Sequence, residues 1–172
     1  CKKINDELIY AQFSYIMILL SLDYDKYKVF SEAFHDAVHH KLLTNMTRIN
    51  TIPPQELCDK HLMAEIREIT RIPNTIKTGK AIIANIPDTF RLGSGHVKFF
   101  YNKLLFLKNR YQNLYDECIF RGFNVSDHKN SFDDLPANLM NDWKPTEDSI
   151  SLIRERIKER MINMKNIKFS GY

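Results

Sequence analysis

The stretch from His96 to Arg121 constrains the fold more than any other part of the chain. It contains no glycine or proline, and its apolar residues recur mostly at steps of three and four. They are Val97, Phe100, Tyr101, Leu104, Leu107, Tyr111, Leu114 and Cys118. This repeat gives a helix one apolar face, and Gly122 is a residue at which a helix naturally stops. The spacing predicts one long core helix over His96–Arg121.

Two further segments have a helical repeat. The first follows Pro53-Pro54 and carries Cys58, Leu62, Ile66 and Ile69. The second starts at Thr146, a suitable N-cap, and carries Ile150, Ile153, Ile157, Met161 and Met164. Short loops are expected around Pro73, Gly79, Pro87, Gly93 and Gly95. No run alternates as a strand would, so we predict that residues 46–172 form an all-α, compact single-domain bundle of three main helices with irregular loops.

Residues 1–45 are predicted to be an N-terminal helical extension, with segments at Leu8–Leu22 and Tyr27–Leu43. The first segment is apolar but only fifteen residues long, which is too short to span a membrane. Asp23-Tyr24-Asp25 follows it where a signal peptide would have small residues. We expect an intracellular, soluble protein whose functional start is Met46.

Basic residues are concentrated in one part of the chain. Ten lie between Lys60 and Arg110 against three acidic residues, whereas residues 1–45 carry five basic and six acidic residues. A local basic excess favours a polyanionic partner such as nucleic acid. A solvated charged surface explains the same excess equally well.

The cysteines and histidines indicate no metal site. Cys1, Cys58 and Cys118 are odd in number and widely spaced, which argues for a reducing compartment and against disulfides or structural zinc. His35 and His39 are one helical turn apart but have no evident third ligand. We therefore predict neither a metal nor a cofactor.

Three groups of segments, in order along the chain, carry a resemblance to a known family. The first comprises Met46-Thr47-Arg48-Ile49-Asn50, Asp59-Lys60-His61-Leu62-Met63-Ala64-Glu65 and Arg67-Glu68. The second comprises Leu92-Gly93-Ser94-Gly95-His96-Val97, Phe99-Phe100-Tyr101, Lys103-Leu104, Glu117-Cys118 and Arg121-Gly122-Phe123-Asn124. Pro136, Pro145, Ser149-Ile150 and Arg156 form the third. Together they make residues 46–172 resemble the phage-type endonuclease V family of pyrimidine-dimer DNA glycosylase/AP lyases.

The resemblance implies a DNA-repair enzyme that excises UV-induced cyclobutane pyrimidine dimers and then cuts the strand by β-elimination. It makes the N-terminal amine of Thr47 the nucleophile and Glu68 the catalytic carboxylate. The residues that it assigns to DNA phosphates and the lesion are Arg48, His61, Arg67, Arg71 and Arg156. Its partner is double-stranded DNA containing pyrimidine dimers or abasic sites, and we expect the protein to act as a monomer.

An α-amine suits this chemistry, because its reference pKa is about 7.7–8.0 against about 10.4 for lysine. The Schiff base that it forms makes the neighbouring C2′ proton acidic enough for elimination. Arg67 and Arg71 are expected to keep Glu68 ionised. Thr47 can act only if Met46 is removed and Thr47 becomes the first residue.

Alternative interpretations stay open. If Thr47 remains inside the chain, the protein is a non-catalytic helical protein that binds DNA damage. A helical protein-interaction module fits the periodicity as well, but it leaves the basic excess unexplained. Without the resemblance, we interpret His61 as an ordinary exposed or half-buried histidine and His96 as a residue that supports a helix end. We interpret Phe99-Phe100-Tyr101 as core residues. The tail 166–172 is poorer in aromatic residues than the family's tail, which leaves the lesion range open.

Overall fold

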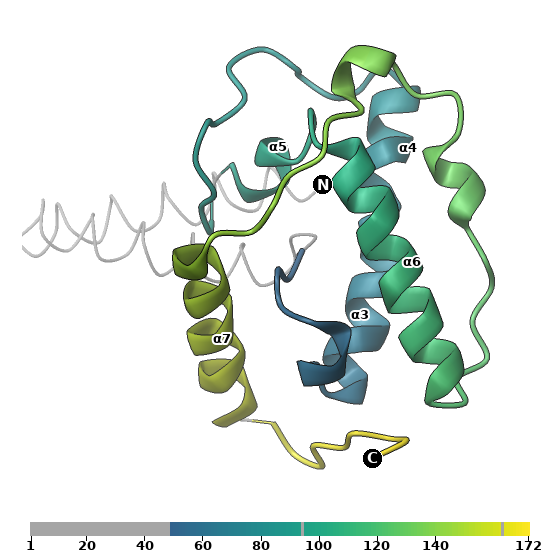
Figure 1. The fold of residues 1–172 in the computed structure, drawn as a ribbon, viewed down its shortest axis with the longest axis vertical. Helices are drawn as coiled ribbons and strands as arrows, with labels where there is room; N and C mark the ends of the chain where they lie inside the picture. Colours follow the sequence, from purple (N-terminus) through teal and green to yellow (C-terminus); the bar gives the residue numbers. More distant parts are fainter. Residues whose placement is uncertain (1–48, 94, 163) are drawn as a thin grey trace, which may run out of the picture. The chain divides into compact units, whose positions relative to one another are not determined.

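The computed structural model describes residues 49–93, 95–162 and 164–172. Its long helices are α3 (Asp59–Ile69), α6 (Leu104–Phe120) and α7 (Glu147–Ile162) (Figure 1). Its short helical elements are α4 (Arg71–Lys77), α5 (His96–Phe99), η1 (Pro54–Glu56), η2 (Lys129–Phe132) and η3 (Ala137–Leu139). Within these residues an isolated bridge between Lys103 and Met140 is the only strand-like pairing. The all-α prediction is confirmed, while the helical segments predicted within residues 1–45 lie outside the described part of the chain.

Helices α3 and α6 pack side by side and form the centre of the core (Figure 1). The apolar stripe predicted for the first segment is confirmed: Cys58, Leu62, Ile66 and Ile69 are all buried. Leu104, Leu107, Tyr111, Leu114 and Cys118 are the buried residues of the α6 stripe. Each such large apolar side chain stabilises the fold by about 1.5–3 kcal/mol when fully buried. The stripes therefore fix how the two helices face each other.

Helix α3 ends at Ile69 because of Pro73. A proline ring clashes with the carbonyl of the residue four positions earlier, which here is Ile69. The chain turns at Thr70 and starts again as α4, where Pro73 lies in the first turn and its missing N–H is not needed. Pro73 was expected to lie in a loop, and that expectation is wrong.

The single helix predicted over His96–Arg121 is interrupted. Helix α5 ends at Phe99, residues 100–103 form turns, and α6 begins only at Leu104. Side chains replace lost helical bonds: Lys103 Nζ, from the same segment, donates to the Phe99 carbonyl, and Asn141 Nδ2, from a distant loop, donates to the Asn102 carbonyl. The predicted stop is confirmed, because Gly122, at φ 76°, lies in the two-bond turn that ends α6.

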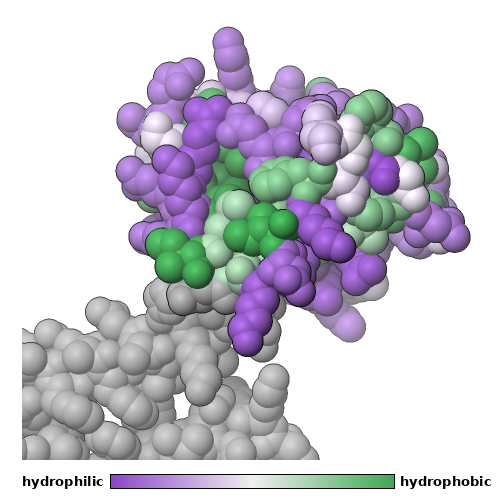
Figure 2. Space-filling model, turned by 90° about the horizontal axis from the view of Figure 1, so that it is seen from below, coloured by the Kyte–Doolittle hydropathy of each residue, from purple (hydrophilic) through white to green (hydrophobic). Residues whose placement is uncertain are grey.

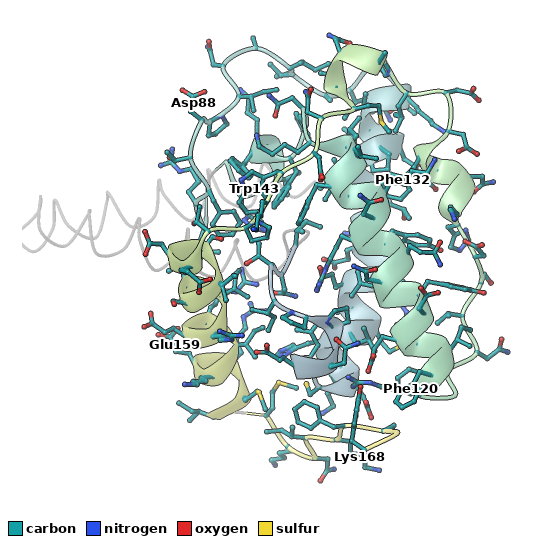
Figure 3. The ribbon with its side chains drawn as sticks, viewed as in Figure 1. Asp88, Phe120, Phe132, Trp143, Glu159 and Lys168 are labelled. Carbon is teal, nitrogen blue, oxygen red and sulfur yellow. The ribbon has the colours of Figure 1, made fainter. Side chains whose placement is uncertain are left out.

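Helix α7 begins as predicted, since the Ser149 N–H donates to Thr146 Oγ1 at 3.2 Å. Trp143, just before it, points into the interior, as does Phe132 on the other side of α6 (Figure 3). Trp143 stacks on Phe90 and packs edge-on against Phe99 and Phe100. Phe99 and Phe100 are fully buried, so their prediction as core residues is confirmed.

Candidate functional site

Helix α3 carries a polar stripe beside its apolar one. His61, Glu65 and Glu68 follow each other at steps of four and three, which places them on one face of the helix. Glu65 is buried, whereas His61 and Glu68 are half-buried. Charged groups that are turned away from water need partners. The residues that pair with His61, Glu65 and Glu68 therefore show where the candidate functional site lies.

Glu65 is the centre of a buried ion-pair network. Arg110 on α6 donates from Nε and Nη2 to the two carboxylate oxygens at 2.9 and 3.0 Å. Asn50 donates its backbone N–H to Oε1 at 3.0 Å and its side-chain amide to Oε2 at 2.6 Å. Arg110 also donates to the Ile52 carbonyl. The Glu65–Arg110 ion pair thus holds residues 49–52, which we call the head segment, between α3 and α6.

His96 holds the same segment from a third element. Its Nε2 accepts the Ile49 N–H at 3.1 Å, while Nδ1 lies 2.9 Å from the Arg91 carbonyl. The proton therefore belongs on Nδ1. Burial lowers the pKa of His96 to about 4, which leaves the ring neutral near pH 7. His96 lies at a helix end, as expected, but its ring binds the head segment.

Arg156, on α7, completes the head cluster, which we define as Asn50, Glu65, His96, Arg110 and Arg156. Its Nη2 donates to Asn50 Oδ1 at 2.6 Å. Its Nε, like Nδ1 of His61, is buried with no hydrogen-bond partner among the described residues. Burial lowers the pKa of Arg156, and burial together with the charge of Arg156 lowers the pKa of His61. Two polar groups at this site therefore retain unused hydrogen-bonding capacity.

Glu68 lies one turn beyond Glu65. Arg71 Nη1 approaches Glu68 Oε1 at 3.8 Å, and both Arg67 and Arg71 are exposed. Burial raises the pKa of Glu68, and Arg71 offsets only part of that rise. The contact with exposed Arg71 is long, so its effect on the pKa of Glu68 is smaller than that of desolvation. That the arginines keep Glu68 ionised stays a prediction.

Thr47 and Arg48 lie outside the described residues, but chain length limits where they can be. Three residues span at most about 11 Å when fully extended, so Thr47 stays within that distance of Asn50. Asn50 is bonded to Glu65, whose Cβ is about 5–6 Å from that of Glu68 on the same helical face. The described residues thus bring the chain to the polar stripe of α3, and Thr47 itself lies outside them.

Sequence reasoning missed most of the head cluster. Arg110 was counted in the basic excess, although its side chain is only 6% exposed and is paired with Glu65. Asn50 and Glu65 were given no role. The step of three from Glu65 to Glu68 was a usable signal, because it places both carboxylates on one face of α3. The partners, 15 and 45 residues away, gave no such signal.

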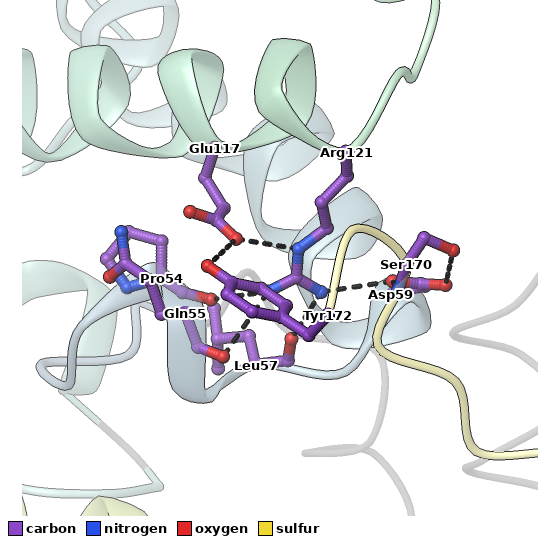
Figure 4. A network of polar contacts seen from close by, with 8 residues as sticks. All are labelled: Pro54, Gln55, Leu57, Asp59, Glu117, Arg121, Ser170 and Tyr172. Carbon is purple, nitrogen blue, oxygen red and sulfur yellow. Dashed lines mark hydrogen bonds and ion pairs between the residues drawn. The ribbon is translucent and has the colours of Figure 1, made fainter.

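A second buried network anchors the C-terminus. Arg121 donates to Glu117 at 2.7 Å, to Asp59 at 3.0 Å and to the carbonyls of Pro54, Gln55 and Leu57 (Figure 4). Ser170 donates twice to Asp59, and Tyr172 donates to Glu117. We call Asp59, Glu117, Arg121, Ser170 and Tyr172 the tail cluster. It fastens residues 168–172 to the start of α3 and the end of α6.

Apolar side chains gather in the middle of the face seen from the C-terminal end, with hydrophilic ones around them (Figure 2). The large exposed apolar side chains near this end include Ile119, Phe120, Ile162, Ile167, Phe169 and Tyr172. Phe120 and Tyr172 pack together, with ring centroids 5.5 Å apart. An open groove beside them is lined by residues 51–55, one face of α6, Ile150 and Tyr172, and none of the predicted site residues lines it.

The described residues bear on the predictions about membrane spans, metal ligands, cysteines and family. No helix in this part of the chain is long and apolar enough to cross a bilayer. No group of three potential metal ligands occurs there; His35 and His39 lie outside it. Cys58 and Cys118 are buried free thiols. Residues 46–131 match the family model of the pyrimidine dimer DNA glycosylases, which confirms the resemblance.

Proposed function

Because the chain belongs to the pyrimidine dimer DNA glycosylase family, we propose that it excises cyclobutane pyrimidine dimers and then cuts the strand as an AP lyase. The nucleophile is the α-amine of Thr47, freed by removal of Met46. Glu68 is the catalytic carboxylate. The substrate is double-stranded DNA containing dimers or abasic sites, bound by a monomer without a metal or cofactor.

The observation that carries this proposal is the attachment of the head segment to α3. Asn50 bonds Glu65, and Glu68 is the next residue of that polar stripe. Thr47 is only three residues before Asn50 in the sequence, which supports its assignment as a neighbour of this half-buried carboxylate. An amine and a carboxylate held together in this way combine a nucleophile with a proton acceptor.

The proposed reaction balances with these two groups. The Thr47 nitrogen attacks C1′ with its lone pair, and the glycosidic bond breaks with its electrons going to the base, which takes up a proton. The ring C1′–O4′ bond then opens, giving a Schiff base and a protonated O4′. Glu68 takes the C2′ proton, and the 3′ phosphate leaves with the C3′–O electrons. No oxidant or reductant is needed.

The environment of Glu68 fits proton transfer. Burial raises its pKa, which makes the carboxylate a stronger base than an exposed glutamate. The nearby Arg71 offsets part of this rise, because a cation favours the ionised form of the carboxylate. A carboxylate here also stabilises positive charge that develops at C1′.

The proposed DNA contacts come from exposed arginines and from half-buried side-chain nitrogens. Arg67 and Arg71 are exposed at the end of α3 and the start of α4. The unused Arg156 Nε and His61 Nδ1 suit acceptors such as phosphate oxygens. Arg48 adjoins Thr47 in sequence. Together they supply a cationic surface around the proposed nucleophile.

The direct test is borohydride trapping on duplex DNA that contains a dimer or an abasic site. N-terminal sequencing of the protein made from its own gene first establishes whether Thr47 is residue one. A Thr47-started protein should form a covalent adduct with DNA, because borohydride reduces the Schiff base. Absence of an adduct would support the non-catalytic, damage-binding alternative instead.

Replacing Glu68 by Gln should abolish strand cutting while leaving DNA binding within about threefold, because the amide cannot accept the C2′ proton. Single-turnover cutting and equilibrium binding measure the two effects. Glu159→Gln is the matched control, since Glu159 is exposed on α7 and points outward (Figure 3). Unchanged cutting by Glu68→Gln would remove Glu68 from the mechanism.

A further inference from the structure

We propose that Glu65 and His96 are positioning residues that set the place of the Thr47 amine by binding the backbone of the two residues that follow Arg48. The inference rests on the proposed function, because it assigns these residues to the same nucleophile. It concerns groups with no other evident role in the reaction.

The contacts are made to the backbone itself. The Ile49 N–H is held by His96 and the Asn50 N–H by Glu65, at 3.1 and 3.0 Å. Hydrogen bonds to two successive peptide groups restrict both the position and the direction of the chain. Residues 49–52 therefore form a fixed base, and residues 47 and 48 precede it in the sequence.

Four helices contribute to this base. Glu65 comes from α3, His96 from α5, Arg110 from α6 and Arg156 from α7. Arg110 holds Glu65 with two hydrogen bonds, and the His96 ring is packed between Phe90 and Phe100. Neither acceptor can turn away without breaking other contacts. The register of the head segment is thus set by the whole fold.

His96 is suited to this role in its neutral form only. Nδ1–H donates to the Arg91 carbonyl, so the lone pair on Nε2 is free to accept the Ile49 N–H. The low pKa of the buried ring keeps that lone pair free at the pH of the cell. Glutamine places an acceptor near the position of Nε2, whereas asparagine reaches only the position of Nδ1.

The rate of the proposed reaction depends on the distance between the Thr47 amine and C1′. Displacement of a reacting group by about 1 Å costs on the order of a hundredfold in rate. Glu65→Gln exchanges one acceptor oxygen for an amide that faces the donors of Asn50 and Arg110. The head segment should then shift, and the amine with it.

The experiment measures single-turnover trapping on abasic duplex DNA, using the protein made from its own gene. Glu65→Gln and His96→Asn should lower the rate constant roughly ten- to a hundredfold, while His96→Gln should keep it within about threefold. Glu117→Gln is the matched control, a buried carboxylate that holds Arg121 in the tail cluster. It should lower the amplitude by unfolding some molecules, but leave the rate constant unchanged.

The readouts separate the two levels of inference. If Glu65→Gln lowers only the amplitude, as Glu117→Gln does, its role is structural and the positioning proposal is overturned. If the unaltered protein itself forms no adduct, the proposed function fails. In that case, hydrogen exchange of the full chain still tests whether Glu65 holds the backbone of the head segment. The Asn50 amide should exchange faster in Glu65→Gln than in Glu117→Gln, and equal exchange rates would overturn the positioning proposal.

Discussion

The head and tail clusters contain the same kinds of residue but differ in how many of their polar groups have hydrogen-bond partners. Each joins a buried arginine to a carboxylate of α3 and ties down a chain segment; Arg110 lies in α6, and Arg121 directly follows that helix. In the tail cluster the Arg121 guanidinium has five acceptors. In the head cluster, Arg156 and the adjoining His61 each leave a buried nitrogen without a partner among the described residues.

The pKa shifts show the same difference. Burial would lower the pKa of Arg121, but hydrogen bonds from it to Glu117 and Asp59 raise it overall. Burial likewise would raise the pKa of Asp59, and bonds from Ser170 and Arg121 lower it. At Arg156 and His61, desolvation dominates instead. The charges of the tail cluster are therefore balanced by the described residues, whereas those of the head cluster are not, and we expect the head cluster to be stabilised by an added anion.

The largest expected effect is on the tail cluster. Arg121→Met leaves Glu117, Asp59 and three carbonyls without their donor, so the free energy of unfolding should fall by roughly 3–5 kcal/mol. Denaturant unfolding measures the change. Arg154→Met is the control, because Arg154 and Glu56 form an exposed ion pair whose loss should change little. Similar small losses in both variants would mean that the tail cluster does not stabilise the fold.

A smaller effect, of another kind, is expected at the head cluster. Arg156→Met removes a cation that is only partly compensated, so stability should change by less than about 1 kcal/mol. Affinity for duplex DNA should fall roughly ten- to a hundredfold, with a shallower dependence on salt. Binding titrations at several salt concentrations measure both quantities. A large loss of stability with unchanged binding would make Arg156 a structural residue like Arg121.

The smallest effect concerns pH. Because burial and Arg156 lower the pKa of His61, the ring is neutral in the free protein near pH 7. A phosphate beside it would raise that pKa, so DNA binding takes up a proton and affinity increases as pH falls toward the lowered value. His61→Gln should flatten this dependence below about pH 6.5. An unchanged pH profile would show that no phosphate lies beside His61.

Much of the fold was readable from the sequence because it depends on local patterns. The stripe Leu62, Ile66 and Ile69 predicted α3, Thr146 predicted the start of α7, and Gly122 predicted the end of α6. The break between α5 and α6 was not predictable from local spacing. It depends on Met140 and Asn141, which come from a distant loop to replace helical hydrogen bonds.

The candidate site, too, has features that the sequence predicted and features that depend on distant contacts. Sequence alone determined the helical class, the basic excess and the family, since periodicity, composition and ordered motifs are properties of the chain itself. Only the tertiary structure decided that Arg110 is an internal partner, that Glu68 is a partly desolvated carboxylate, and that His96 and Glu65 hold the head segment. The physical reason is that desolvation and hydrogen-bond partners depend on which residues surround a group, and those residues come from helices far apart in the sequence.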